Sequence, residues 1–320
     1  MNRRAVVFQA PGRIEIREDE IPSPGDGEIL VRASVSGISA GTERHFYRGD
    51  LAPGTVLDEA LGSLEGDFRY PMTYGYACVG ETGDEGRRVF AFHPHVSHFL
   101  AREEDVYELP RELSTEAAAM WPSVETAVNL VLDARPLVGE RVVVVGQGVV
   151  GLVTTSLLSQ FPLAELSTVD PIEARRTAST LCGASRSLHP EEIGDLEDVD
   201  LAIEVSGTAA GLNLAVGATG FEGRVVIGSW YGDEPVAAEL GTHFHRGRLR
   251  LISSQVSHLG APLSSRWTKR RRMEAAARAL TRVPVEALVT HRFPLDRAAD
   301  AYQLIDERPA ACLQVLLTYT

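Results

Sequence analysis

The stretch that decides the fold runs from Arg141 to Gly151 and reads RVVVVGQGVVG. Four consecutive valines are typical of a strand that is buried on both faces, as in a parallel sheet. The glycines follow directly. Gly146 permits a tight turn, Gly148 lets backbone amides approach a pyrophosphate, and Gly151 allows close packing of a helix on the strand. The stretch therefore predicts a strand, a glycine turn and a helix, with a dinucleotide site at the turn.

The same motif indicates which groups hold the dinucleotide. The helix N-terminus, with Gln147, Val149 and Val150, offers the positive end of a helix dipole to the phosphates. Asp170 ends the next predicted strand about 20 residues on, where a carboxylate can accept the ribose hydroxyls and repels a 2′-phosphate. This favours NAD(H) over NADP(H), although Arg175 lies near enough in sequence to weaken the preference. The alternative is a glycine turn in another α/β protein, with Asp170 capping the following helix.

Strands and helices alternate after this motif. The expected strands are 141–145, 166–170, 199–205, 224–229 and 249–254, and the expected helices are 149–160, 172–182 and 209–218. This α/β series predicts a parallel doubly wound sheet, which binds its ligands at the carboxyl ends of the strands. Further candidate cofactor residues follow two of those ends: Ser206, Gly207, Gly228 and Ser229.

The first hundred residues are β-rich instead. We expect strands at 5–9, 13–17, 28–36, 77–82, 88–92 and 98–102, and no helix of ordinary length before about Ser114. The segment 49–71 is rich in Gly, Asp and Pro and reads as a loop that covers a pocket. The tail returns to a strand at 291–293, a helix at 295–306 and a strand at 312–319.

Composition excludes several classes of protein. The 320 residues are 44% hydrophobic and 23% charged, which is ordinary for a globular protein. A net charge of -13 argues against a non-specific nucleic-acid binder, so we expect the run Lys269–Arg272 to be a solvated helix face. Three scattered cysteines make no disulfide framework, and no stretch resembles a signal peptide or a membrane span. A cytoplasmic protein without nucleic-acid or membrane partners is expected.

The chain resembles the medium-chain dehydrogenase/reductase family over essentially its whole length. The resemblance rests on GERVVVVGQGVVGL, VDLAIEVSG, GRVVIGSW and HRFPLDRAADAYQLID. SGISAGTERHFYRG and YPMTYGYACVGE resemble the branch that contains bacteriochlorophyllide a dehydrogenase. The family implies a GroES-like β-barrel catalytic domain at 1–118 and 285–320, and a Rossmann domain at 119–284. It also implies that Thr126 lies near the nicotinamide, and that a homodimer forms through the edge strand 249–254.

The resemblance also shows where this sequence departs from the zinc-binding members. Those members hold zinc with a Cys, a His and a Cys or Glu, and the corresponding positions here are Ser39, Tyr76 and Trp121. None of these is an ordinary zinc ligand. The four-cysteine structural lobe is missing as well, so we expect no zinc. His93 and His95, in the sequence HPHVSH, could still line the substrate pocket, bind a metal, or be plain loop histidines.

Without zinc, hydrogen-bond donors have to stabilise the reacting oxygen. One well-aimed donor is worth roughly 2.7–4 kcal/mol. Thr42 matches the family's hydroxyl residue that touches the substrate oxygen, and Tyr76 and Ser39 offer two further hydroxyls. Glu43 and His45 could orient each other or the substrate, or could instead form a surface ion pair. The alternative for Tyr76 and Trp121 is that they only fill the volume left by the metal.

The expected function is a zinc-independent, NAD(H)-dependent oxidoreductase. Its small-molecule substrate would be a secondary alcohol or ketone on a larger organic molecule. A second reading is an NAD(P)H-dependent quinone or enoyl reductase, against which Asp170 counts because such enzymes usually prefer NADPH. A third is a non-catalytic NAD-binding protein.

Overall fold

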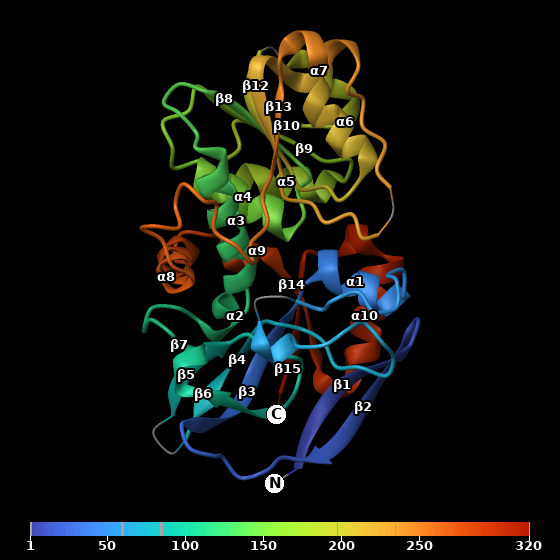
Figure 1. The fold of residues 1–320 in the computed structure, drawn as a ribbon, viewed down its shortest axis with the longest axis vertical. Helices are drawn as coiled ribbons and strands as arrows, with labels where there is room; N and C mark the ends of the chain where they lie inside the picture. The colour runs from blue at the N-terminus through green and yellow to red at the C-terminus, as the bar shows by residue number, and fades with distance from the viewer. Residues whose placement is uncertain (1, 59–60, 84–85, 197, 234, 320) are drawn as a thin grey trace. The chain divides into compact units, whose positions relative to one another are not determined.

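The computed structural model describes residues 2–58, 61–83, 86–196, 198–233 and 235–319. The chain folds into two compact units (Figure 1). The terminal unit comprises Met1–Pro122 and Val285–Thr320, and the central unit comprises Ser123–Pro284. The first division lies a few residues beyond the expected boundary at 118. Within the described ranges, no helix is both long and apolar enough to cross a bilayer.

The central unit is built on a six-stranded parallel sheet with the order β10-β9-β8-β11-β12-β13. This is the doubly wound order in which strand order reverses between the first and fourth strands, here β8 and β11. The predicted Rossmann sheet is confirmed. Its strands are β8 (Arg141–Val145), β9 (Glu165–Val169), β10 (Arg186–Leu188), β11 (Val199–Glu204), β12 (Thr219–Ile227) and β13 (Arg250–Ser253). Its helices are α3 (Trp121–Ala134, which begins in the terminal unit), α4 (Val149–Leu158), α5 (Glu173–Leu181), α6 (Ala209–Ala218), α7 (Thr242–Gly247) and α8 (Lys269–Leu280).

Alternate valines of β8 point to opposite faces of this sheet. Val142 and Val144 pack against α3 and α4, whereas Val143 and Val145 pack against α6. Side chains alternate along a strand, so a run that is apolar on both faces requires helices on both sides. The run of valines therefore places the glycine turn at the end of a strand that is held from both sides.

One strand of this sheet was missed in the sequence. The strand β10 (Arg186–Leu188) pairs with β9, so 199–205 corresponds to the fourth strand of the sheet and not the third. The three residues Arg-Ser-Leu contain no β-branched residue and no alternation that could signal a strand. Pairing with β9, rather than local propensity, stabilises β10. The edge strand β13 coincides with the predicted dimer strand, and the dimer stays a prediction.

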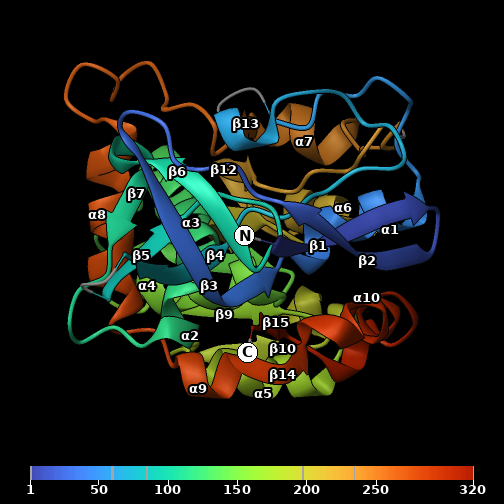
Figure 2. The same ribbon diagram turned by 90° about the horizontal axis from the view of Figure 1, so that it is seen from below.

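The terminal unit contains a β-hairpin and a seven-stranded sheet. The hairpin pairs β1 (Asn2–Ala10) with β2 (Arg13–Glu20), which run side by side in Figure 2. The sheet has the order β14-β15-β3-β4-β5-β7, and β3 pairs with β6 as well as with β4. Its strands are β3 (Glu28–Ile38), β4 (Cys78–Thr82), β5 (Arg87–Ala91), β6 (His98–Arg102), β7 (Val106–Glu108), β14 (Val289–Pro294) and β15 (Gln314–Thr318). The helices of this unit are α1 (Ala40–Arg48), α2 (Thr115–Ala118), α9 (Val285–Leu288) and α10 (Ala298–Glu307).

The helix α1 contradicts the expectation that no ordinary helix precedes Ser114. Its buried face consists of Phe46 and the carboxylate of Glu43. Because an acidic residue occupies the buried face, the helix lacks the apolar periodicity that reveals helices in sequences. The helix ends at Gly49, a residue type that commonly ends helices. Gly49 has a left-handed conformation (φ 72°), and its amide donates to the His45 carbonyl.

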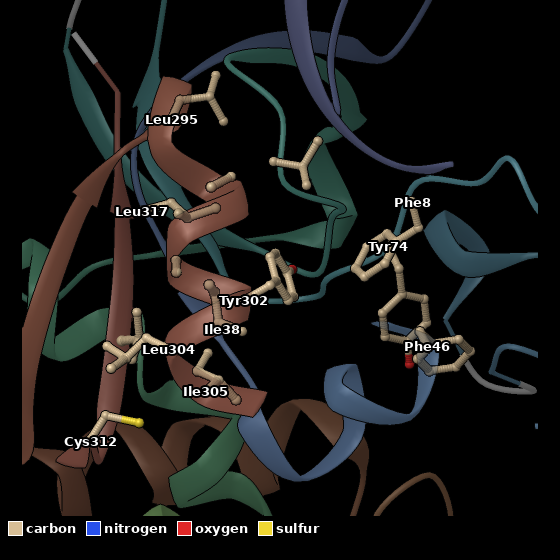
Figure 3. Close-up of a cluster of buried hydrophobic side chains, with 14 of the residues drawn as sticks. Phe8, Ile38, Phe46, Tyr74, Leu295, Tyr302, Leu304, Ile305, Cys312 and Leu317 are labelled. Atoms are coloured by element: carbon tan, nitrogen blue, oxygen red, sulfur yellow. The ribbon is translucent and has the colours of Figure 1, made fainter. Parts of the chain in front are cut away.

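The C-terminal helix α10 packs into the core of the terminal unit. Figure 3 shows Leu304 and Ile305 of this helix within the apolar cluster and Tyr302 directed toward Phe8. The Phe8 and Tyr302 rings meet edge to face with 5.1 Å between centroids. Such pairs are favourable beyond their buried area. The tail thus completes the core that surrounds α1.

The basic helix α8 is not wholly solvated, which corrects the expectation for Lys269–Arg272. Arg272 is 1% exposed. Its guanidinium donates twice to Glu125 Oε1 (3.0 and 2.8 Å), once to Asn129 Oδ1 (2.7 Å) and once to the Val256 carbonyl (2.5 Å). A buried charge persists only when it is paired and hydrogen-bonded. Arg272 therefore joins α8 to α3, and charge counting along the sequence could not distinguish it from its exposed neighbours.

Replacing Arg272 with Leu should destabilise the protein by about 3–5 kcal/mol, because the Glu125 carboxylate would remain buried without its partner. The matched control is Arg278→Leu, which removes an exposed arginine from the same helix and should change stability by less than about 0.5 kcal/mol. Urea denaturation followed by circular dichroism measures both. Equal midpoints for the two variants would contradict the structural role given to Arg272.

Candidate functional site

The glycine turn after β8 has the geometry that the sequence predicts. Gly146 has a φ of 96°, and a Cβ there would lie 2.6 Å from the Ser206 backbone. A Cβ on Gly151 would lie 1.9 Å from the Gly146 carbonyl oxygen. A Cβ on Gly148 would meet no atom within 4 Å. Two of the glycines are thus required by packing, whereas the third leaves open space at the start of α4.

The first turn of α4 supplies donors beside that open space. Gly148 caps the helix, and Val149 and Val150 begin it, all three partly exposed. The first amides of a helix have no carbonyl partner within the helix and carry the positive end of its dipole. Gln147 behaves differently, because its buried side chain donates to the carbonyls of Val144 and Gly146. Its side chain supports the turn from inside.

Asp170 lies at the end of β9 and faces the turn. Its Oδ2 accepts the Gln147 amide and its Oδ1 accepts the Ile172 amide, both at 2.8 Å. Arg175 lies 3.9 Å from the same carboxylate. The carboxylate is 3% exposed and already fixed in orientation, which prepares it to accept further donors.

The remaining predicted cofactor residues of the central unit gather at the neighbouring strand ends. The contact of Gly146 with Ser206 joins the ends of β8 and β11, which is the topological switch point where such sheets bind ligands. The Gly207 amide donates to Ser229 Oγ (2.8 Å). A Cβ on Gly228 would strike Leu130 of α3 at 2.5 Å. Thr126 is half-buried on the same helix.

Sequence reasoning missed two residues at this edge. Glu204 ends β11 and is fully buried. Its Oε1 accepts the Ser206 amide (2.7 Å) and hydroxyl (2.5 Å), and its Oε2 accepts the Tyr231 hydroxyl (2.5 Å). Burial and the carboxylate raise the pKa of Tyr231 well above its usual value, so the phenol remains a donor. An acidic residue inside the apolar run VDLAIEV was the available signal.

In the terminal unit, the structure brings together three predicted hydroxyl residues. The Tyr76 phenol is hydrogen-bonded to the side chains of Ser39 and Thr42. Ser39 precedes α1, Thr42 lies in its first turn, and Tyr76 lies just before β4. We call Ser39, Thr42 and Tyr76 the hydroxyl cluster. Burial raises the pKa of Tyr76 to about 12, while its hydrogen bonds to Ser39 and Thr42 act in the opposite direction.

Glu43 and His95 lie behind the hydroxyl cluster, fully buried and in contact. His95 Nε2 donates to Glu43 Oε2 (2.9 Å), and the Ser39 amide donates to Glu43 Oε1 (2.8 Å). His45, for which a bond to Glu43, a contact with the substrate and a surface ion pair were the alternatives, contacts Asp50 through its Nδ1 (2.9 Å). Glu43 is thus bound to the loop that begins α1.

The other predicted pocket residues have separate partners. The His93 ring stacks on Phe99, with 4.0 Å between centroids, and burial lowers the pKa of His93 to about 4. Trp121 is buried against Phe90 and Tyr107. These contacts place His93 and Trp121 in packing environments, apart from the bonds that join Ser39, Thr42 and Tyr76.

The donors at the predicted zinc positions do not fit a zinc ion. Ser39 and Tyr76 present hydroxyl groups, and Trp121 presents an indole, whereas zinc sites use Cys, His, Asp or Glu. Within residues 2–58, 61–83, 86–196, 198–233 and 235–319, no group of three such side chains could hold a metal.

Known proteins resemble the chain over 93–99% of its length. No family model matches it. It is 27% identical to YphC of Escherichia coli, an uncharacterized zinc-type alcohol dehydrogenase-like protein, over 94% of this chain and 95% of that protein. It is 23% identical to sorbitol dehydrogenase of Macaca fascicularis, over 93% and 91% of the two chains. An alcohol dehydrogenase of Escherichia coli, RspB, solved in complex with NADH, is 20% identical and covers 99% of both chains with a TM-score of 0.78.

The glycine turn yields a matched pair of variants. Gly148→Ala should leave stability almost unchanged but weaken dinucleotide binding, because its methyl group enters the open space beside α4. Gly151→Ala should destabilise the protein by about 1–3 kcal/mol, because the helix must move away from the strand. Thermal unfolding and NADH fluorescence titration measure the two effects. Unimpaired binding by Gly148→Ala would exclude this turn as the phosphate site.

Proposed function

We propose that the chain is a zinc-independent, NAD(H)-dependent oxidoreductase of the alcohol dehydrogenase-like group of medium-chain dehydrogenases/reductases, a proposal that its similarity to such proteins over nearly its whole length supports. The proposed reaction interconverts a secondary alcohol and a ketone on a larger organic molecule. The observation that carries the proposal is the hydroxyl cluster, in which Ser39 and Tyr76 stand at two positions where zinc-binding members hold the metal. Thr42 joins them through its hydrogen bond to Tyr76.

The central unit supports a nicotinamide dinucleotide as the cofactor. Gly148 and the first turn of α4 would hold the pyrophosphate, and Asp170 would accept the ribose hydroxyls. A carboxylate at that point repels a 2′-phosphate, which supports NAD(H) over NADP(H). The bound nicotinamide supplies or accepts hydride, and the protein contributes positioning and electrostatics.

The terminal unit supports the stabilisation of the reacting oxygen. Since the pKa of Tyr76 is raised to about 12, its phenol is protonated at neutral pH and donates a hydrogen bond. A donor aimed at the oxygen where negative charge develops is worth roughly 2.7–4 kcal/mol. Two such donors would supply several kcal/mol, comparable to the contribution of a metal ion that polarises a carbonyl.

The proton balance follows from the same groups. When an alcohol is oxidised, its carbon loses a hydride and its oxygen loses a proton. Thr42 receives that proton while its own hydroxyl proton passes to Tyr76, the phenol proton of Tyr76 passes to Ser39, and the partly exposed Ser39 releases a proton to water. The reverse transfers protonate the oxygen during ketone reduction. The hydroxyl cluster therefore relays a proton without a net change in its own charge.

Thr42→Val tests this assignment. The variant keeps the shape of the side chain but removes its hydroxyl, so kcat should fall by about 10²–10³-fold while the Kd for NADH is unchanged. Thr281→Val, which removes an exposed hydroxyl at the end of α8, is the control and should keep full activity. Steady-state kinetics on a panel of secondary alcohols, ketones and enones, with product analysis, gives the result. Unchanged turnover in Thr42→Val, or reduction of C=C bonds alone, would refute the proposal.

Asp170→Asn tests the cofactor preference. Removing the negative charge should lower the ratio of kcat/KM for NADH to that for NADPH by about tenfold, which corresponds to about 1.4 kcal/mol. Glu173→Gln removes an equal charge from the exposed first turn of α5 and should leave the ratio unchanged. An unaltered protein that already prefers NADPH would contradict the role given to Asp170.

A further inference from the structure

A chain of buried polar groups runs behind the hydroxyl cluster. Tyr302 of α10 donates to Glu43 Oε2 (2.5 Å), which also accepts His95 Nε2 (2.9 Å). On the other side of the imidazole, Nδ1 lies 2.7 Å from Ser36 Oγ, and Ser36 Oγ lies 2.7 Å from the Tyr319 hydroxyl. Four separate parts of the sequence meet here, and the roles assigned above to Ser39, Thr42 and Tyr76 do not account for this chain.

His95 is the member that contacts both segments carrying the hydroxyl cluster. Through Glu43 it reaches α1, in which Thr42 is the adjacent residue. The imidazole also packs against Gly75, the neighbour of Tyr76. Gly75 has a φ of 118°, and a Cβ there would lie 2.5 Å from two atoms of the His95 ring.

The backbone of His95 also bonds to the segment that contains Gly75 and Tyr76. Its amide donates to the Tyr74 carbonyl (3.3 Å), and its carbonyl accepts the Val6 amide (2.9 Å). His95 is therefore bonded to the segment 74–76 by one main-chain hydrogen bond, to β1 by another, and to α1 by its side chain. Phe46 and Tyr74 also bring α1 and this segment together, with 3.9 Å between ring centroids, but an apolar contact is less directional than a hydrogen bond.

From these contacts we infer that His95 is a positioning residue of the reaction centre, which holds Thr42 and Tyr76 in register through its hydrogen bond to Glu43 and its packing against Gly75. The inference rests on the proposed function for its kinetic consequences. Tyr302 assists His95, because it occupies the second donor site on the same carboxylate oxygen.

Burial explains why this arrangement is rigid. Glu43 and His95 are both 0% exposed. A carboxylate without access to water is tolerated only when donors surround it, and here it accepts the Ser39 amide, the His95 imidazole and the Tyr302 phenol. Displacement of α1 relative to His95, whose amide is bonded to the Tyr74 carbonyl, would break the bond between His95 and Glu43. The cost of an unpaired buried charge thus opposes movement of the hydroxyl cluster.

The principal test is His95→Gln, compared with His98→Gln as the matched control. His98 lies three residues away, is partly exposed, and has Nδ1 close to Ser97 Oγ (3.1 Å), outside the chain of buried groups. We expect His95→Gln to lower kcat by about 10–100-fold, the range that a misplacement of about 1 Å produces. The Kd for NADH should be unchanged in both variants, and His98→Gln should retain full kcat.

Two further variants separate positioning from general destabilisation. In the Thr42→Val background, His95→Gln should add little to the loss, because residues that act through one another are non-additive. Tyr302→Phe keeps the ring that packs on Phe8 but removes a donor from Glu43, so it should fold and show a smaller loss of kcat. Full kcat in correctly folded His95→Gln and in Tyr302→Phe, or losses in Thr42→Val and His95→Gln that multiply, would overturn the inference.

A spectroscopic measurement keeps this inference distinct from the proposed function. In protein labelled with 3-fluorotyrosine, the ¹⁹F signal of Tyr76 is identified by its loss in Tyr76→Phe. We expect this signal to shift in His95→Gln but not in His98→Gln, whether or not the protein turns over any alcohol. An inactive unaltered protein with the expected shifts would refute the function alone, whereas an unshifted Tyr76 signal would refute the positioning role.

Discussion

The burial of one carboxylate constrains the reaction centre. Glu43 lies on the inner face of α1, where an apolar side chain would ordinarily pack, and it accepts donors from three separate segments. Because removing any donor would leave a charge in a low-dielectric interior, the start of α1, the residues around His95 and the helix α10 have to keep fixed positions. The C-terminal tail is thereby part of the environment of Thr42 and Tyr76, although it is distant from them in the sequence.

A second constraint acts in the central unit and is steric. Gly146 and Gly151 are required because backbone atoms occupy the places where their Cβ atoms would be. These contacts fix the start of α4 against the ends of β8 and β11, the place where a doubly wound sheet binds its ligand. Two side chains satisfy backbone groups of the turn. The Asp170 carboxylate accepts the Gln147 amide, and the buried Gln147 side chain donates to the Val144 carbonyl.

The sequence was sufficient for features that depend on local pattern. The valine run, the glycine spacing and the alternation of strands and helices predicted the parallel sheet. Burial on both faces requires apolar residues throughout a strand, and close approach of two backbones requires glycine, so both features can be read from residue types. Features set by tertiary contact were hidden. The helix α1 carries Glu43 on its buried face, β10 is only Arg-Ser-Leu, and Arg272 looks like its solvated neighbours. His95 and Tyr302 meet Glu43 only in the folded chain, so no spacing rule joins them.

We propose that the hydroxyls of Thr42 and Tyr76, in place of a metal ion, stabilise the reacting oxygen. The most direct measurement is the metal content and turnover of one purified sample before and after exhaustive treatment with a strong chelator. We expect metal far below one ion per chain and the same kcat after treatment. Stoichiometric zinc, with activity that is lost on its removal and restored by its return, would contradict it.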